Sequence, residues 1–189
     1  MEFLQNITET RGFPREYDGA ILAALTGYPE LKNTSIQFKT TKSHPVPYGT
    51  TPDLRSYFLP ASRRSYTITI LEQAEGPEEK ALFHNLSAES QLGIIAHELG
   101  HVVQFSKRSV PGLWLTVILF LFPFYKKKME RGADRLAIQH GFGEELLKQC
   151  VYLRSIPGYV RQRPGIAKNY LSPEEIKIEK GFFALIQKE

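Results

Sequence analysis

Two histidines and a glutamate stand within five consecutive residues, where His97, Glu98 and His101 form the pattern H-E-x-x-H. On a helix, residues four apart differ by about 40° in direction, so both imidazoles project from one face. Both rings can then bind one zinc ion at about 2.0–2.1 Å. Glu98 would be close enough to take a proton from a water molecule held by the same ion. The pattern predicts zinc-dependent hydrolysis with Glu98 as the general base.

An ordinary amphipathic helix with solvated histidines is the alternative interpretation of this pattern. It predicts that both histidines and Glu98 lie on a polar outer face. The pattern instead stands among apolar residues, which are Leu92, Ile94, Ile95, Leu99, Val102 and Val103. Burying two imidazoles and a carboxylate costs several kcal/mol unless something compensates, and a metal ion does so. The sequence therefore favours a buried metal site.

A catalytic zinc site usually has three protein ligands and one open position. No histidine follows His101 closely, since the next one is His140. A carboxylate from a second helix is the remaining option, and Glu130 and Asp134 share one helix face because they are four residues apart. Glu130 is the predicted third ligand, and Asp134 is predicted to accept a hydrogen bond from a ligand histidine. The small residue Ala133 on this face would let the two helices approach closely.

The combination of H-E-x-x-H with a later E-x-x-A-D resembles the gluzincin metallopeptidases. The nearest branch contains the membrane heat-shock protease, the CAAX prenyl protease and the compact minigluzincins. The resemblance implies one zinc ion bound by His97, His101 and Glu130, with Asp134 behind the ligands and Glu98 as the base. It covers less than a third of the chain, which lacks the several transmembrane helices of the membrane members. The implied reaction is hydrolysis of a peptide bond in a peptide or protein substrate.

One further expectation concerns the residue that stabilises the oxyanion. In many zinc peptidases an Arg, His or Tyr stabilises the oxyanion, and the candidates here follow the second metal-binding helix. These candidates are Tyr152, Arg154, Tyr159 and Arg161. A surface loop rich in Tyr and Arg is the alternative for these residues. For the whole chain, the alternative to a peptidase is a zinc-bound scaffold or regulatory module with little activity, associated with a membrane or a partner.

Hydrophobic periodicity places the motif in an α+β fold. Helical spacing predicts a helix over 15–31, and alternation predicts strands over 33–42 and 64–73 with a short strand candidate over 55–59. Residues 43–54 are rich in proline and are predicted to form a loop. The other predicted elements are a helix capped by Ser87 and reaching Phe105, a helix ending at His140, a helix over 144–156, an irregular segment over 157–171 and a last helix capped by Ser172.

These elements predict one zincin-like domain over residues 1–189, with an apolar insertion at 110–125. An N-terminal helix and a small, mostly antiparallel sheet would pack on the zinc helix, and the C-terminal half would be helical. The resemblance gives the strand over 64–73 the role of the upper rim of the cleft. There it would pair with an extended peptide by adding a strand to the sheet.

The insertion at 110–125 is almost purely apolar. As a helix its sixteen residues span about 24 Å, which is short of the ~30 Å hydrocarbon core of a bilayer. If His101 and Glu130 bind one ion, both ends of the insertion lie on one side of any membrane, which excludes a single crossing. Contact with an anionic membrane surface through the insertion and its flanking Lys and Arg clusters is one prediction. A core helix or a dimer surface is the other.

Composition indicates the class of protein, its possible partners and its location. The chain is 42% hydrophobic and 23% charged, as is ordinary for a globular domain. Its net charge of +4 comes without a nucleic-acid-binding motif, so no nucleic acid partner is expected. The single cysteine, Cys150, fits a reducing compartment, and Met1–Asn6 lack the pattern of a signal peptide. The predicted location is the cytoplasm, peripheral or monotopic on the cytoplasmic face of a membrane, and nothing indicates an oligomeric state.

Overall fold

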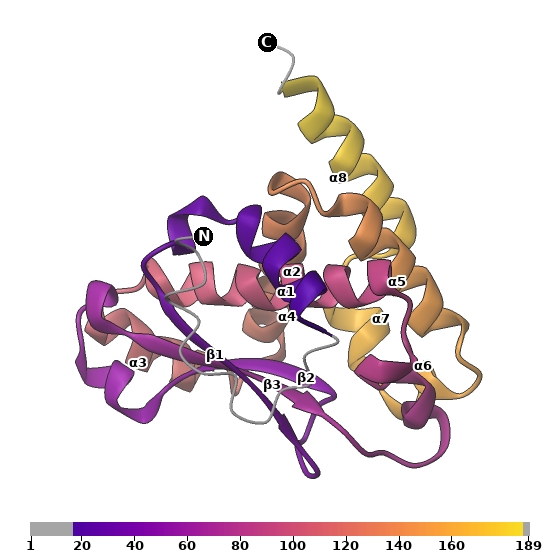
Figure 1. Cartoon of the computed structure of the whole chain (residues 1–189), viewed down its shortest axis with the longest axis horizontal. Coiled ribbons are helices and arrows are strands. Elements are labelled where there is room, and N and C mark those ends of the chain that lie inside the picture. Colours follow the sequence, from indigo (N-terminus) through magenta and orange to yellow (C-terminus); the bar gives the residue numbers. More distant parts are fainter. Residues whose placement is uncertain (1–16, 187–189) are drawn as a thin grey trace.

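A small sheet lies against the longest helix of the described chain, and these two elements form the centre of the fold (Figure 1). The computed structural model describes residues 17–186. The strands are β1 (Ser35–Thr41), β2 (Tyr48–Pro52) and β3 (Ser65–Leu71). The helices are α1 (Asp18–Thr26), α2 (Ala88–Ser106), α3 (Val110–Leu119), α4 (Pro123–Gln139), α5 (Gly143–Ser155), α6 (Tyr159–Gln162), α7 (Gly165–Asn169) and α8 (Pro173–Ile186). The predicted α+β class is confirmed.

The sheet is mixed, with the strand order β1-β3-β2. β3 pairs parallel with β1, in a register that sets Ser65 beside Ser35, and antiparallel with β2. The prediction of a mostly antiparallel sheet was therefore wrong. Alternation of apolar residues specifies which face of a strand is buried, and it carries no information on strand direction.

The central position of β3 also contradicts the role predicted for residues 64–73. A strand that is paired on both sides has no free backbone edge to offer to a peptide. Among residues 17–186, the unpaired edge next to the metal motif belongs to β2, which lies inside the segment 43–54 that was wrongly predicted as a loop. Pro47 and Pro52 stand just before β2 and at its end, and an edge strand tolerates proline because part of its backbone needs no partner.

The short strand predicted over 55–59 is a 3₁₀ turn, Leu54–Phe58. Asp53, just before this turn, explains the difference. Its carboxylate accepts hydrogen bonds from the hydroxyls of Ser65 and Thr67, at 2.6 and 2.7 Å. Its carbonyl oxygen also accepts the backbone N–H of Ser56. These contacts tie the turn to β3 in place of the ladder that a fourth strand would have formed.

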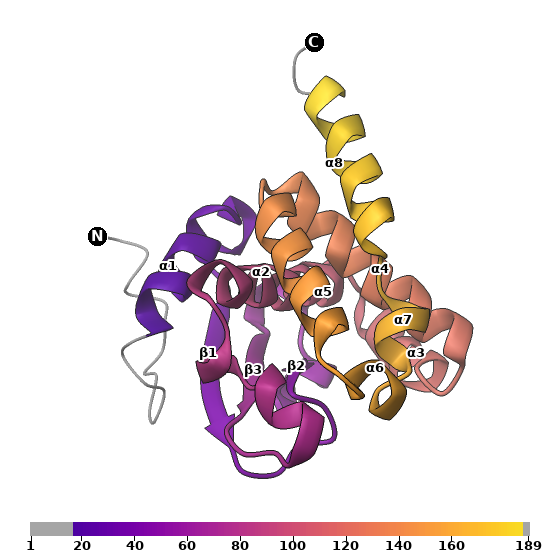
Figure 2. The ribbon, with the colours of Figure 1, turned by 90° about the vertical axis from the view of Figure 1, so that its right-hand side faces the viewer.

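Helix α2 begins where the sequence predicts. The Ser87 hydroxyl caps it by accepting the backbone N–H of Ser90. The side chains of Ile95, Leu99 and Val102 are fully buried in the core that also contains the apolar residues of β3. In Figure 2 α1 lies to the left of α2, the sheet lies below it, and α4 and α5 lie to its right. The metal motif is thus enclosed from several sides.

Two glycines let α2 approach its helical neighbours. A Cβ atom at Gly93 would lie 2.6 Å from the carbonyl oxygen of Glu145 on α5. A Cβ atom at Gly100 would lie 2.9 Å from the carbonyl oxygen of Ala133 on α4. Both distances are shorter than real Cβ contacts allow, so these positions accept no larger side chain without a shift of the backbone. Gly100 and Ala133 therefore set the spacing between the two helices that carry the predicted ligands.

Replacement of Gly100 by Ala is expected to destabilise the protein by roughly 1–3 kcal/mol, the usual cost of overpacking. In thermal unfolding followed by circular dichroism, Tm should fall by several degrees for a chain of this length. Gly181→Ala is the matched control, because a Cβ atom there has no neighbour within 4 Å and alanine favours the helix by about 0.5–1 kcal/mol. Equal Tm values for the two variants would show that the α2–α4 contact is not close.

The remaining helices differ from the predictions mainly at their ends. α1 is shorter than the predicted 15–31, since the chain turns before Pro29, and residues 15 and 16 lie outside the described range, as do Met1–Asn6. α4 stops before Gly141, whose φ of +90° favours glycine. The segment 157–171, predicted to be irregular, contains the short helices α6 and α7. α8 begins at Pro173, as predicted, and its far end projects from the body in Figures 1 and 2.

Candidate metal centre

The three chemically active residues of the motif lie in the middle of α2 and are buried. The exposed fractions are 5% for His97, 5% for Glu98 and 7% for His101. An amphipathic helix with solvated histidines would have exposed them, so that alternative was wrong. The cost of burying these groups must be met by partners inside the protein.

Helix α4 brings Glu130 to the two histidines. Its Oε2 atom lies 3.3 Å from Nε2 of His97 and 3.2 Å from Nε2 of His101. One ligand atom of each residue can be chosen so that all three lie within 4.8 Å of one another. A tetrahedral ion with ligands at about 2.0–2.1 Å places neighbouring ligand atoms about 3.3 Å apart. The two short distances match that geometry, and this buried group could hold a metal ion.

The other ring nitrogens of both histidines have acceptors of their own. Nδ1 of His97 lies 2.8 Å from a carboxylate oxygen of Asp134, and Nδ1 of His101 lies 3.1 Å from the amide oxygen of Gln104. Each Nδ1 therefore carries the proton and donates it, which leaves Nε2 as the atom that faces Glu130. This is the tautomer that a metal-binding histidine needs. Gln104 was not predicted, although its place three residues after His101 on a helix was a usable signal.

Without a metal ion, the same contacts favour a charged histidine. Burial lowers the pKa of His97, but hydrogen bonds with Asp134 and Glu130 raise it well above its usual value. Burial raises the pKa of Glu130, but hydrogen bonds with His101 and His97 bring it far below the usual range. A metal ion must displace a proton from this group, so metal affinity should increase as the pH rises.

Asp134 has two partners on its two oxygens. One oxygen faces His97, and the other accepts the backbone N–H of Leu171 at 2.8 Å. Leu171 directly precedes Ser172, the cap of α8. The carboxylate that orients a candidate ligand therefore also holds the start of the C-terminal helix in place.

The edge strand β2 supplies a partner for Glu98. The Thr50 hydroxyl lies 2.7 Å from Oε2 of Glu98 and 3.1 Å from its backbone oxygen. Donation to the carboxylate oxygen would fix the orientation of the Glu98 side chain. Sequence reasoning missed Thr50 because it assigned this segment to a loop, and no local pattern connects residue 50 with residue 98.

Tyr170 is a second residue that the sequence did not identify. Its ring centre lies 5.4 Å from that of His97. Burial raises the pKa of Tyr170 well above its usual value, and the nearby carboxylates of Glu130, Glu98 and Asp134 raise it further, with a hydrogen bond to Glu130 adding to the effect. The tyrosine therefore remains a neutral hydroxyl at the edge of the candidate metal group.

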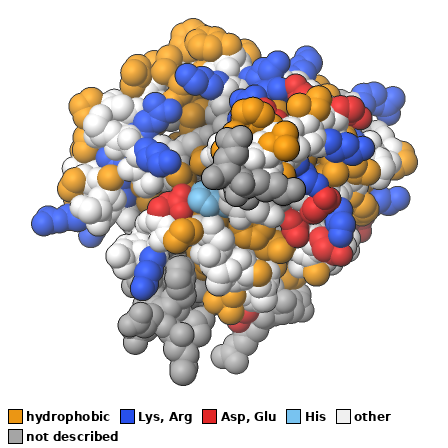
Figure 3. Space-filling view, turned by 90° about the horizontal axis from the view of Figure 1, so that it is seen from above, with side chains coloured by type: hydrophobic (Ala, Val, Ile, Leu, Met, Phe, Trp, Pro, Cys, Tyr) orange, Lys and Arg blue, Asp and Glu red, His pale blue; other side chains and the backbone are white. Residues whose placement is uncertain are grey.

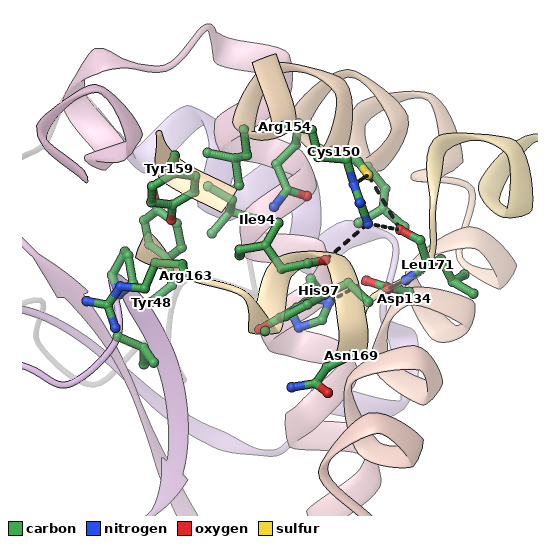
Figure 4. Close-up of a pocket in the computed structure, with 18 of the residues that line it drawn as sticks. Tyr48, Ile94, His97, Asp134, Cys150, Arg154, Tyr159, Arg163, Asn169 and Leu171 are labelled. Carbon is green, nitrogen blue, oxygen red and sulfur yellow. Dashed lines mark hydrogen bonds and ion pairs between the residues drawn. The ribbon is translucent and has the colours of Figure 1, made fainter. Parts of the chain in front are cut away.

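A cavity of about 310 Å³ opens beside this group. Figure 4 shows Tyr48, Tyr159 and Arg163 on one side of it and His97 and Asp134 on the other. Apolar side chains form much of its remaining wall, namely Val46, Ile94, Leu146, Leu153, Ile166 and Ile176. The cavity thus joins a mainly apolar chamber to the buried charged group.

Two of the four predicted oxyanion candidates line this cavity. Tyr159 lines it, is fully buried and has a pKa raised to about 12, chiefly by burial. Arg154 also lines it, but its guanidinium donates to the sulfur of Cys150 and to the carbonyl oxygens of Ile166 and Leu171 (Figure 4). The Tyr152 hydroxyl donates to the carbonyl oxygen of Lys80. Neither Tyr152 nor Arg161 lines the cavity.

Comparison with known proteins adds no assignment to this geometry. Neither family models, nor curated proteins, nor solved structures gave a match to the chain. The interpretation of the site therefore depends on its own residues, their distances and their burial.

Proposed function

We propose that this protein is a zinc-dependent metallopeptidase of the gluzincin type, with a zincin-like fold. One observation carries the proposal: Glu130 lies 3.2–3.3 Å from both motif histidines in a buried group beside Glu98. Two histidines and a glutamate are a ligand set of catalytic zinc sites, which leave one position open. Asp134 and Gln104 behind the histidines add the outer contacts that such sites use.

When bound, zinc would supply a Lewis acid that acidifies water and polarises the scissile carbonyl group. Glu98 takes the proton of the attacking water and later delivers it to the leaving amine. The Thr50 hydroxyl holds the Glu98 carboxylate in one orientation during both transfers. A substrate side chain bound in the mainly apolar cavity would displace water from it, which would strengthen the electrostatic interactions inside it.

The substrate would lie along β2 and place a side chain in the cavity. β2 is an edge strand that carries Thr50, and its residue Tyr48 lines the cavity. An extended peptide paired with this edge would bring its scissile bond to the metal group while an adjacent side chain enters the apolar chamber. A peptide or protein substrate with large apolar residues fits this arrangement.

In this proposal, Tyr170 donates a hydrogen bond to the oxyanion. Loss of one such donor typically lowers kcat by about 100- to 1,000-fold. Tyr170→Phe is expected to show such a loss in kcat with little change in KM and in metal content. Tyr152→Phe is the matched control, because its hydroxyl contacts Lys80 away from the cavity. A Tyr170→Phe enzyme with full kcat would exclude this role.

The proposal is tested by digesting a broad peptide library with the zinc-loaded protein, with and without a chelator. Cleavage that the chelator stops and added zinc restores is the expected result. Elemental analysis of the same sample gives the zinc content. Stoichiometric zinc without cleavage would instead support a zinc-bound scaffold, and absence of zinc binding would contradict both functions.

A further inference from the structure

An apolar surface lies where α3 meets α4. Of the segment 110–125, only Leu113, Thr116 and Tyr125 are buried. Large apolar side chains of this segment are exposed to solvent, namely Trp114, Leu115, Val117, Ile118, Leu121, Phe122 and Phe124. We refer to these seven side chains as the apolar corner. Hydrophobic side chains gather at the upper left edge of Figure 3, over α3 and α4, with Lys and Arg side chains beside them. So large a set of exposed apolar groups indicates a binding surface.

A second chain segment extends the apolar corner. Tyr57 and Phe58 each place their ring centre 5.5 Å from that of Trp114. Phe58 and Leu54 remain 67% and 81% exposed and so add to the same surface. The two segments are far apart in the sequence, which is why the sequence alone did not connect them.

A buried arginine holds the two segments together. The guanidinium of Arg64 donates to the carbonyl oxygen of Leu59, at 2.9 Å, and to those of Phe105 and Arg108, at 3.0 and 2.7 Å. Phe105 lies in the last turn of α2, and Arg108 lies just before α3. The surface is therefore fixed by the fold before any partner arrives.

The two segments that form the surface carry charges of one sign. Residues 99–129 contain five Lys or Arg and no Asp or Glu, and residues 54–64 contain three Arg and no acidic residue. Lys107, Lys127 and Lys128 are exposed beside the apolar corner. Basic residues next to exposed apolar and aromatic side chains are typical of proteins that bind anionic lipid surfaces.

We propose that the apolar corner, with Leu54 and Phe58, inserts into one leaflet of an anionic membrane. Among the described residues, no single helix is long and apolar enough to cross a bilayer. α3 and α4 meet that test only as a pair, and they are bent by 119°. His101 and Glu130, on the two sides of the corner, meet in one buried group. The corner can therefore dip into the leaflet and return on the same side.

Self-association is the main alternative, and the charges argue against it. A symmetric dimer would place the same surface of two copies face to face. Apart from the buried Arg64, the basic residues of these two segments would then approach their own copies with no acidic residue of the segments between them. A lipid surface supplies the opposite charge, and the tryptophan at the corner suits the interfacial region of a membrane.

The first test uses Trp114, the single tryptophan of the chain, in the full-length protein. Vesicles of phosphatidylcholine with phosphatidylglycerol should shift its emission to the blue, and lipids brominated on their acyl chains should quench it. Vesicles of phosphatidylcholine alone should bind more weakly, and added salt should reduce binding to the anionic vesicles. An emission spectrum that neither vesicle changes would overturn the proposal.

The second test uses paired variants in vesicle flotation. Leu121→Ser with Phe124→Ser removes two side chains that are 82% and 68% exposed, and should weaken binding by at least about tenfold. Ile178→Ser with Leu185→Ser is the matched control on α8, where the exposed fractions are 72% and 68%. This control should bind as the original protein does. Equal binding by both double variants would contradict the proposal.

The charge contribution is tested separately. Lys127→Gln and Lys128→Gln should each lower binding to the anionic vesicles by about fivefold, and leave binding to neutral vesicles unchanged. Lys42→Gln and Lys80→Gln are the controls, because both lysines are exposed on other segments. Sedimentation without lipid completes the set. A dimer that Leu121→Ser with Phe124→Ser dissociates, together with no vesicle binding, would assign the surface to a second copy and overturn the lipid proposal.

Discussion

Replacement of Glu98 by Gln should abolish peptide hydrolysis while the metal content stays the same. Glutamine has the same shape as glutamate, and its amide oxygen can still accept a hydrogen bond from Thr50. It cannot take a proton, so the variant loses general base catalysis, which contributes about 100- to 10,000-fold. Glu98 is not part of the group that could hold the ion, so metal binding should not change.

The measurement pairs initial rates of peptide cleavage with elemental analysis of the same preparation. Glu89→Gln is the matched control, since Glu89 lies in the first turn of the same helix and is exposed to solvent. It should keep full activity. A Glu98→Gln protein that retains more than a tenth of the original rate would remove Glu98 from the role of base. A variant without metal would instead show that Glu98 supports the ion.

Replacement of Glu130 by Ala is expected to have the largest effect on metal binding. The variant leaves two neutral histidine nitrogens and removes the only carboxylate that lies 3.2–3.3 Å from both of them in the described chain. Zinc should then be lost on dialysis against a weak chelator. In the metal-free variant the pKa of His97 should also fall, because a hydrogen bond that raises it is gone.

Asp134→Asn should have a graded effect on the same property. Both partners of Asp134 are donors, the His97 ring and the Leu171 backbone N–H. Asparagine offers only one acceptor oxygen, so one of the two contacts is lost. Changes of this kind behind a ligand typically weaken metal affinity by about 10- to 100-fold. Competition with a fluorescent zinc chelator gives the affinities, and Gln139→Ala, at an exposed position in the last turn of α4, should match the original protein. For the other variant, Glu130→Ala, a zinc affinity equal to that of the original protein would show that the third ligand is a different residue.

The local parts of the candidate site were accessible from the sequence. His97, Glu98 and His101 are close because they share one helix, and Glu130 and Asp134 are close for the same reason. The Ser87 cap predicted the start of the first helix, and the glycines after His140 predicted the end of the second. The expectation that these two groups of residues meet came from the chemistry of zinc, since a catalytic zinc site requires a third ligand.

Thr50 and Tyr170 could not be predicted in this way. Thr50 reaches Glu98 only because β2 occupies the edge of the sheet beside α2, and that strand is stabilised by pairing with β3. Tyr170 reaches His97 only because α5, α6 and α7 fold back over the cavity. In both cases tertiary packing decides the position, and the local sequence of Pro, Gly and polar residues indicates only irregular structure.

The apolar insertion shows the same division between local and tertiary information. Its composition left membrane contact, a dimer surface and a buried core helix as alternatives, and the break between the two helices at Pro123 follows from the helix-breaking properties of proline. The contribution of Leu54 and Phe58 depends on the contacts of Arg64, which span some forty residues of sequence. No local sequence pattern indicates that residues 54–64 lie next to the apolar insertion.

The close packing at Gly93 and Gly100 has a consequence for recognising distant relatives. H-E-x-x-H alone is a short pattern that arises by chance in many sequences. The close spacing of α2 from α5 and α4 requires glycine at positions 93 and 100, where a Cβ atom would collide with the neighbouring backbone. Ala133 is the residue of α4 that Gly100 contacts. These three residues extend the pattern to G-x-x-x-H-E-x-G-H followed by E-x-x-A-D. A search with this longer signature would select sequences that can build the same helix spacing, as well as the same ligands.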